Sequence, residues 1–138
     1  MKLNLKAQTT MEGIYSFNAV NASTGESRHL VDVADSPNMI VKAGLNAVGG
    51  GATLIHQCCI GTNSTTVTFN DTGLGAQIAA TTTIQSSTYG AASSAPYYRW
   101  YRKTFRFDQG VAAGNLAEVG MKTSSGTLFS RALIVDSA

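Results

Sequence analysis

The feature that most constrains this chain is the scarcity of charge in its central part. Residues 43–98 contain a single charged side chain, Asp71, and residues 61–95 are rich in serine and threonine. Such a composition favours extended segments and loops over an amphipathic helix. A free monomer normally spreads charge over its surface, which keeps it soluble. We therefore predict that other protein surfaces cover this one, in a homo-oligomer or in a larger assembly.

Size and charge balance narrow the class further. With 138 residues and 43% hydrophobic content, the sequence predicts one domain over residues 1–138. The formal net charge of +2 argues against a general attraction to nucleic acid or to an anionic membrane. No apolar run approaches the ~18 residues of a membrane span, so no span is expected. Residues 1–7 lack the apolar core of a signal peptide, which predicts synthesis in a cytoplasm.

Two hairpins are predicted from local patterns. Residues 13–19 and 27–33 alternate polar and apolar side chains around a turn-like segment, Asn-Ala-Ser-Thr-Gly. Residues 116–122 and 127–135 flank a short segment that ends in Gly126, which is typical of a tight hairpin loop.

Helical signals are fewer. Ser36 suits a helix cap and Pro37 the first helical position, and glycines at 49–51 end the pattern. The residues expected inside this helix are Met39, Ile40, Ala43, Leu45 and Ala47. A short turn of helix is also expected near residues 71–78, capped by Asp71 or Thr72.

Two further segments read as strands and complete the fold prediction. Residues 54–60 are mostly apolar, as in a strand buried on much of both faces. Residues 97–107 alternate along a long strand, and neither of its faces is purely apolar. About seven strands and one helix predict an all-β fold, a two-layer antiparallel β-sandwich of jelly-roll-like form. A partly closed barrel is the alternative.

Residues that commonly carry chemistry form no recognisable site. His29 and His56 lack acidic neighbours at a triad-like or metal-ligand spacing. His56 and Cys58 would share a strand face, but a closed zinc site needs about four ligands and no second pair follows. Adjacent Cys58 and Cys59 would point to opposite faces of a strand, so both are expected to be reduced. We predict no enzymatic activity, no metal site and no cofactor.

The sharpest local feature is the mixture of basic and aromatic side chains in residues 97–107. Arginine and tyrosine are enriched at protein interfaces, whereas basic and aromatic residues together also bind single-stranded nucleic acid. The low net charge favours the protein interface. Trp100 and the tyrosines also suit a carbohydrate-binding sandwich, a third and weaker option. The interface candidates are Tyr97, Tyr98, Arg99, Trp100, Tyr101, Arg102, Lys103 and Arg106.

Several short strings carry a family resemblance. They are SAPYYRWYRKTFRF at 94–107, GNLAEVG at 114–120 and LFSRALI at 128–134, with Ala-Gly-Leu from 43, Ile-Gly-Thr from 60 and Asp-Thr-Gly-Leu from 71. In this order they resemble small virion proteins of tailed bacteriophages, often described as tail-fibre or tail-associated. The resemblance spans residues 40–136.

The resemblance implies a virion building block, made in the host cytoplasm, that assembles with other virion proteins. A tail, tail-fibre or baseplate-associated position is the first expectation, and a head decoration or cement protein the second. Because larger relatives continue past the last strand, we do not expect a receptor-binding tip in this chain, and contact with a host receptor stays open. The competing class is a single-stranded nucleic-acid-binding module built on residues 97–107.

Overall fold

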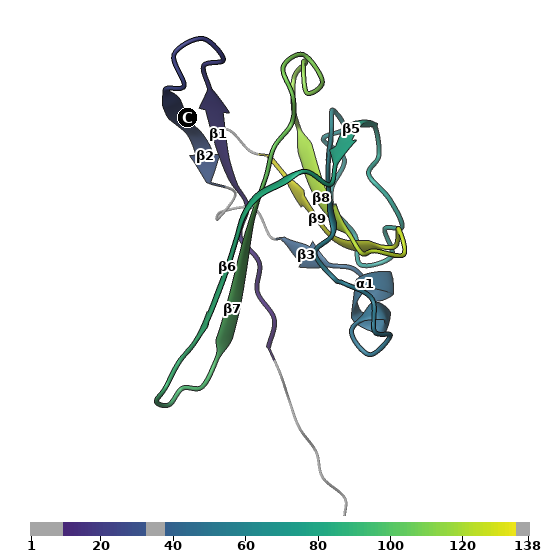
Figure 1. The fold of residues 1–138 in the computed structure, drawn as a ribbon. Coiled ribbons are helices and arrows are strands. Elements are labelled where there is room, and N and C mark those ends of the chain that lie inside the picture. Colours follow the sequence, from purple (N-terminus) through teal and green to yellow (C-terminus); the bar gives the residue numbers. More distant parts are fainter. Residues whose placement is uncertain (1–9, 33–37, 135–138) are drawn as a thin grey trace, which may run out of the picture.

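The fold consists almost entirely of strands. The computed structural model describes residues 10–32 and 38–134, which contain nine strands and one short helix (Figure 1). The predicted all-β class is therefore confirmed. None of the described helices is long and apolar enough to cross a membrane. The elements are β1 (Ser16–Val20), β2 (Ser27–Asp32), β3 (Met39–Ile40), α1 (Lys42–Ala47), β4 (Gln57–Gly61), β5 (Gln77–Thr81), β6 (Ile84–Ala91), β7 (Arg99–Phe105), β8 (Glu118–Lys122) and β9 (Leu128–Leu133).

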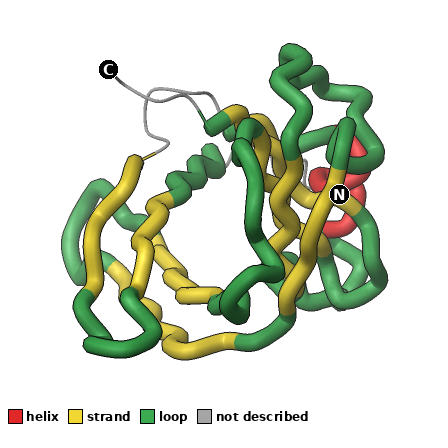
Figure 2. Tube along the Cα trace, turned by 90° about the horizontal axis from the view of Figure 1, so that it is seen from above, coloured by secondary structure: helices red, strands yellow, loops and turns green. Residues whose placement is uncertain are grey.

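One five-stranded sheet forms the centre of the molecule. Its strands lie in the order β3-β9-β8-β4-β5, and all neighbouring strands are antiparallel. Two separate antiparallel hairpins, β1–β2 and β6–β7, make up the remaining strands. Figure 2 shows the strands arranged around the interior of the molecule, with α1 outside them at one side.

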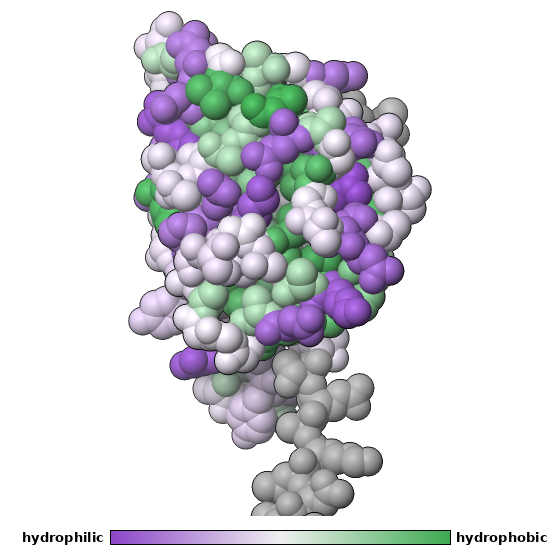
Figure 3. Space-filling model, turned by 90° about the vertical axis from the view of Figure 1, so that its right-hand side faces the viewer, coloured by the Kyte–Doolittle hydropathy of each residue, from purple (hydrophilic) through white to green (hydrophobic). Residues whose placement is uncertain are grey.

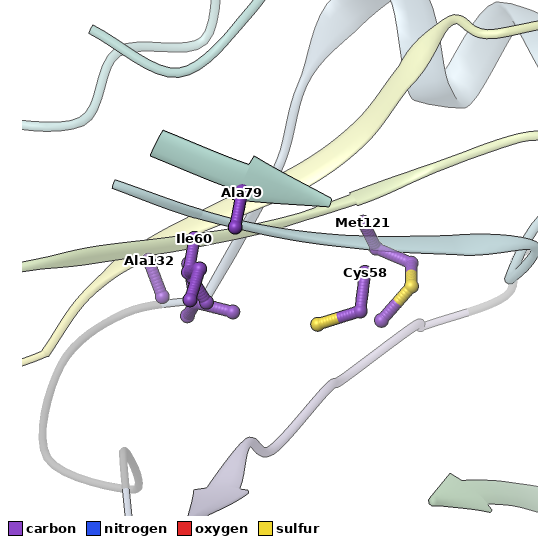
Figure 4. Packing of buried hydrophobic residues seen from close by; sticks show 6 residues of the cluster. Cys58, Ile60, Ala79, Met121 and Ala132 are labelled. Atoms are coloured by element: carbon purple, nitrogen blue, oxygen red, sulfur yellow. The ribbon is translucent and has the colours of Figure 1, made fainter. Parts of the chain in front are cut away.

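The main core lies between this sheet and the two hairpins. Six buried side chains come from one face of the sheet, and Figure 4 shows five of them, labelled, on the same side of it. Tyr15 and Phe17 pack against them from β1 and the segment before it, and Phe105 and Phe107 from β7 and the segment after it. The hairpins therefore act as the second layer, which covers the apolar face of the sheet. The six residues are Cys58, Ile60, Ala79, Val119, Met121 and Ala132.

The opposite face of the sheet is covered by residues 62–76, here called the threonine-rich loop, and by α1. Gly120 of β8 leaves room for Leu74 of this loop, because a Cβ at Gly120 would lie 2.4 Å from the Leu74 Cδ1 atom. Gly44 similarly lets α1 approach β9, since a Cβ there would lie 2.1 Å from the Phe129 carbonyl oxygen. Figure 3, which views this side of the molecule, shows hydrophobic and hydrophilic residues intermingled.

Both predicted hairpins are confirmed. β1 and β2 pair around Asn21, whose side-chain oxygen accepts hydrogen bonds from the N–H groups of Ser23 and Thr24. β8 and β9 pair around a turn that ends in Gly126, whose φ is 82°. The central strand predicted at 54–60 is also confirmed as β4, which begins at Gln57 and is buried on both faces.

The predicted helix is correct only in its second half. Met39 and Ile40 form strand β3, which pairs with Arg131 and Ser130 of β9, and the helix begins after the N-cap residue Val41. Pairing with β9 gives these two residues hydrogen-bond partners in a sheet, and this outweighs their modest local helical signal. The proposed cap at Ser36 and first position at Pro37 lie outside the described residues.

The helical turn predicted at residues 71–78 is wrong. Residues 71–76 form an irregular part of the threonine-rich loop, and β5 follows from Gln77. Asp71 does not cap a helix here, because its carboxylate is bonded to Arg131 and Thr68. The Asp71 carboxylate does accept hydrogen bonds, as a helix cap would, but they come from Thr68 and from the distant Arg131 and not from the N–H groups of a helix.

Candidate interaction surface

The most prominent surface feature is the hairpin β6–β7 together with the connection 92–98, which we call the ribbon. Figure 1 shows the ribbon running away from the five-stranded sheet, so that its tip lies far from the core. Its two strands pair only with each other among the described strands. A two-stranded hairpin by itself is marginally stable in water, so its base must be anchored.

The base of the ribbon is anchored by apolar packing and by one lysine. Phe105 and Phe107 are half-buried against the core cluster. The Lys103 ammonium donates a hydrogen bond to the Ile55 carbonyl oxygen at 2.5 Å. Beyond Lys103, towards the tip, neither strand contributes a residue to the core.

The register places the predicted residues on two faces of the ribbon. Tyr101 lies opposite Tyr89 on one face, and Trp100 lies opposite Gly90 on the other. A Cβ at Gly90 would lie 2.6 Å from the Trp100 indole nitrogen, so the ring extends over this glycine. The alternation predicted for residues 97–107 is confirmed within β7. Both faces carry an aromatic ring.

Large side chains on the ribbon are unusually open to solvent. Tyr89 keeps 79% of its accessible surface, Tyr97 78% and Tyr98 60%, while Trp100 and Tyr101 keep nearly half. Isolated exposed hydrophobic residues are ordinary, whereas several exposed rings on one protruding element make the ribbon a candidate interaction surface.

The cations of the ribbon are only weakly neutralised. The Arg102 guanidinium lies 6.0 Å from the centre of the Trp100 ring, and the Lys103 ammonium lies 5.4 Å from that of Tyr101. Arg106 approaches Asp108 at 3.9 Å, with both side chains largely exposed. Within residues 10–32 and 38–134, neither Arg99 nor Arg102 forms a salt bridge. The ribbon therefore offers unpaired positive charge beside rings.

The eight predicted interface residues do not form one continuous patch. Trp100 and Arg102 share one face of β7, whereas Arg99, Tyr101 and Lys103 share the other. The connection at the tip carries Tyr97 and Tyr98, and Arg106 follows β7 at the base. The structure thus places seven of the eight on the ribbon, over its two faces and its tip, and Arg106 directly after it.

Sequence reasoning missed a buried ion cluster on the far side of the sheet. The Arg131 guanidinium donates to the Glu118 carboxylate at 2.8 Å, to Asp71 at 2.7 Å and to the Thr65 carbonyl oxygen at 3.1 Å. Glu118 is fully buried and also accepts hydrogen bonds from the backbone N–H groups of Gly75 and Ala76. The one charged residue of the neutral central part therefore reaches across to the C-terminal hairpin. Its isolation in the sequence was the only available signal.

The hydrogen bonds of the ion cluster hold the threonine-rich loop against the sheet. Partial burial acts to raise the pKa of Asp71, but hydrogen bonds from Thr68 and Arg131 outweigh it and hold this pKa below its ordinary value. A catalytic acid would need its pKa shifted upwards, towards neutral pH. The cluster instead ties the threonine-rich loop to β8 and β9.

The cysteines considered for chemistry are buried, and the two histidines lie in different parts of the chain. Cys58 and Cys59 are free thiols, both buried, and burial raises the pKa of each. His56 lies just before β4 and is exposed, and the ring of His29 contacts the Asn18 side-chain oxygen at 3.2 Å. In the described part of the chain, no three side chains of the His, Cys, Asp and Glu types come together in a way that would hold a metal ion.

Comparison with known proteins adds no family to this geometry. The chain matches no protein-family model, no curated protein and no solved structure.

Proposed function

We propose that this chain is a structural protein of a tailed-bacteriophage virion and that it works by protein–protein assembly through the ribbon. One observation carries the proposal: the ribbon protrudes, exposes aromatic rings on both faces and carries arginines without carboxylate partners among the described residues. Tyrosine, tryptophan and arginine are the residues that most often supply binding energy at protein interfaces. The order of short motifs that resembles tail-associated proteins supplies the virion context.

The distribution of charge supports an assembly role. Asp71, the only charged residue of the central part, is used internally in the ion cluster, so the surface formed by residues 43–98 has no free ionised side chain. Such a surface is better suited to contact with neighbouring subunits than to long residence in water. A tail, tail-fibre or baseplate-associated position is proposed first, and a head decoration position second.

The proposal is tested by incorporation into particles. Trp100→Ala combined with Arg102→Ala removes a ring and a cation from one face of the ribbon. Phage particles assembled with this variant in place of the normal chain should contain at least tenfold fewer copies, because truncation of interface anchors typically costs about 2 kcal/mol or more. Quantitative mass spectrometry of purified particles measures the copy number, and gold-labelled antibody in electron microscopy locates the chain on tail or head.

A matched control uses the other hairpin. Val20→Ala with Arg28→Ala also removes an exposed apolar residue and an exposed cation, from β1 and β2. This control should be incorporated normally. The proposal is incorrect if wild-type particles contain no copies of this chain. It is also incorrect if the ribbon variant is incorporated at the normal copy number.

The arginines that form no salt bridge within the described part of the chain lie beside exposed rings, and this also favours a second function, the binding of single-stranded nucleic acid. Phosphates would pair with Arg99 and Arg102, and bases would stack on Trp100 or Tyr101. Fluorescence anisotropy with labelled oligothymidine distinguishes the two functions. Binding that weakens at least tenfold between 50 and 200 mM salt and disappears in Arg99→Ala/Arg102→Ala would favour the nucleic acid. No binding at 50 mM salt would remove this candidate.

A further inference from the structure

We infer that two copies of this chain pair through the outer edges of strand β6, so that their ribbons join into one four-stranded antiparallel sheet around a two-fold axis. The inference rests on the proposed assembly function and names its first partner, a second copy of the same chain. It rests on the unpaired backbone groups of β6 and on the contrast between this uncharged strand and the cationic strand β7.

The outer edge of β6 has free backbone hydrogen-bonding groups. The Ala92 N–H donates to the Tyr98 carbonyl oxygen at 2.9 Å, which fixes the alternation of bonded and non-bonded pairs along the ribbon. By this alternation, Ser87, Tyr89 and Ala91 direct their N–H and C=O groups away from β7. No hydrogen bond to another described residue satisfies them. An unpaired row of this kind is a template for another strand.

Strand β6 also lacks the usual protection of an edge. Proteins commonly block exposed edges with charged residues, proline or a very short strand. β6 has eight residues, Ile84–Ala91, with neither a charge nor a proline. Its one irregularity is a bulge near its start, between Ile84 and Ser86. Six residues beyond the bulge therefore present a regular, uncharged edge.

Charge decides which edge meets a second copy. β7 carries three cations, Arg99, Arg102 and Lys103, whereas β6 carries no charge at all. Contact between two β7 strands would place these like charges on adjacent strands, which is destabilising. Contact between two β6 strands places the β7 strands at the outside, about 14 Å apart at the usual strand spacing. The neutral edge is therefore the one that complements itself, as a two-fold interface requires.

Pairing through β6 would also make the ribbon more stable than it is in a single copy. A two-stranded hairpin is marginal in water, whereas a sheet of three or more strands is stable. Tyr89 and the Trp100 ring, which extends over Gly90, would then gain cross-strand neighbours from the second copy on opposite faces. The cationic outer edges would stay free for other partners.

Single cysteines locate the contact directly. Each is introduced alone into the full chain, and mild oxidation followed by non-reducing electrophoresis measures the disulfide-linked dimer. The β6 positions are Ser86, Ser87, Thr88 and Tyr89, and their directly opposed controls on β7 are Thr104, Lys103, Arg102 and Tyr101. The buried native thiols stay out of the reaction in the folded protein.

Cross-linking should peak at the β6 position on the two-fold axis and fall within two residues of it. The yield there should exceed that of every β7 control at least tenfold, because a disulfide cannot join Cα atoms more than about 7 Å apart. Equal or greater cross-linking on β7, or a monomer at every concentration up to the millimolar range, would overturn the inference.

A second pair of variants tests the edge without cysteine. Tyr89→Pro and Tyr101→Pro make the same change at directly opposed positions, and each removes an N–H that points away from the partner strand. Light scattering should give a mass of about twice 14.4 kDa for Tyr101→Pro and about 14.4 kDa for Tyr89→Pro. The reverse result would place the contact on β7. A chain incorporated into particles yet monomeric in solution would refute this pairing alone and leave the proposed virion role intact.

Discussion

Arg131 is the residue on which the threonine-rich loop most depends. Its side chain is 4% exposed, and the guanidinium joins Glu118 of β8 to Asp71 of the loop. Arg131→Met should lower the free energy of unfolding by about 3–5 kcal/mol, because it leaves a buried carboxylate without its counter-charge. Urea unfolding measures the change. Arg28→Met, at an exposed arginine of β2, should stay within about 0.5 kcal/mol of the normal chain.

The pH dependence of stability should report on Asp71. Its pKa is lowered in the folded protein, so its contribution is complete above the ordinary value of 3.8 and is lost as the pH falls through the folded value. At pH 6, Asp71→Asn should therefore be less stable than the normal chain by about 1–3 kcal/mol. The difference between the two proteins should shrink below about pH 4. A difference that stays constant down to pH 2 would contradict this assignment.

The thiols should be unreactive in the folded state. Burial, with Cys59 as a smaller cause, raises the pKa of Cys58 from 9.0 to about 12, which lowers the fraction of thiolate about a thousandfold. Labelling with iodoacetamide at pH 7.5 should therefore be slow without denaturant and complete within minutes in 8 M urea. Mass spectrometry counts the labels. Rapid labelling of the native protein would mean that β4 is not buried as described.

At the scale of the elements, α1 depends on the close approach of Gly44 to β9. Gly44→Ala would place a Cβ within 2.1 Å of the Phe129 carbonyl oxygen, so the helix would have to move. We expect a loss of about 1–3 kcal/mol in the free energy of unfolding. Gly49→Ala is the matched control, because no atom lies within 4 Å of a Cβ at that position. Equal effects of the two substitutions in thermal unfolding would argue against close packing of α1.

Elements defined by neighbouring residues were predictable from the sequence. The turn around Asn21 and the loop ending in Gly126 specify their hairpins locally, and both hairpins were predicted. Strand β3 was not predicted, because Met39 and Ile40 become a strand only through pairing with β9. Arg131 likewise reaches Asp71 and Thr65 across 60 and 66 residues of the chain, and no local pattern records such partners.

The sequence predicted which residues belong to the candidate site but did not predict that they lie on a protruding two-stranded hairpin. The alternation of residues 97–107 correctly assigned Trp100 and Tyr101 to opposite faces. It left open which strand would pair with β7, because residues 84–91 carry only a weak polar strand pattern. Both faces of the ribbon are exposed because β7 pairs only with β6 among the described strands and because the ribbon lies apart from the five-stranded sheet. Residues 97–107 alone predict neither the pairing nor the separation.

At the scale of the whole molecule, the outer part of the ribbon should be removable. Thr88 and Arg102 form a bonded pair by the alternation described above, so a two-residue Asn-Gly turn can close the hairpin directly after them. Replacing residues 89–101 in this way should leave the unfolding midpoint in urea nearly unchanged, since these residues are absent from the core cluster. It should also abolish self-association. A large drop in the midpoint would mean that the ribbon supports the sheet.

The order of strands in the central sheet has a consequence for biosynthesis. β9 is the last of the described strands along the chain, yet it lies between β3 and β8 in the sheet. When the nascent chain has emerged only as far as β8, strand β3 has no β9 to pair with. The Asp71 carboxylate then also lacks its partner, the Arg131 guanidinium. The central sheet can therefore close only after β9 has emerged from the ribosome.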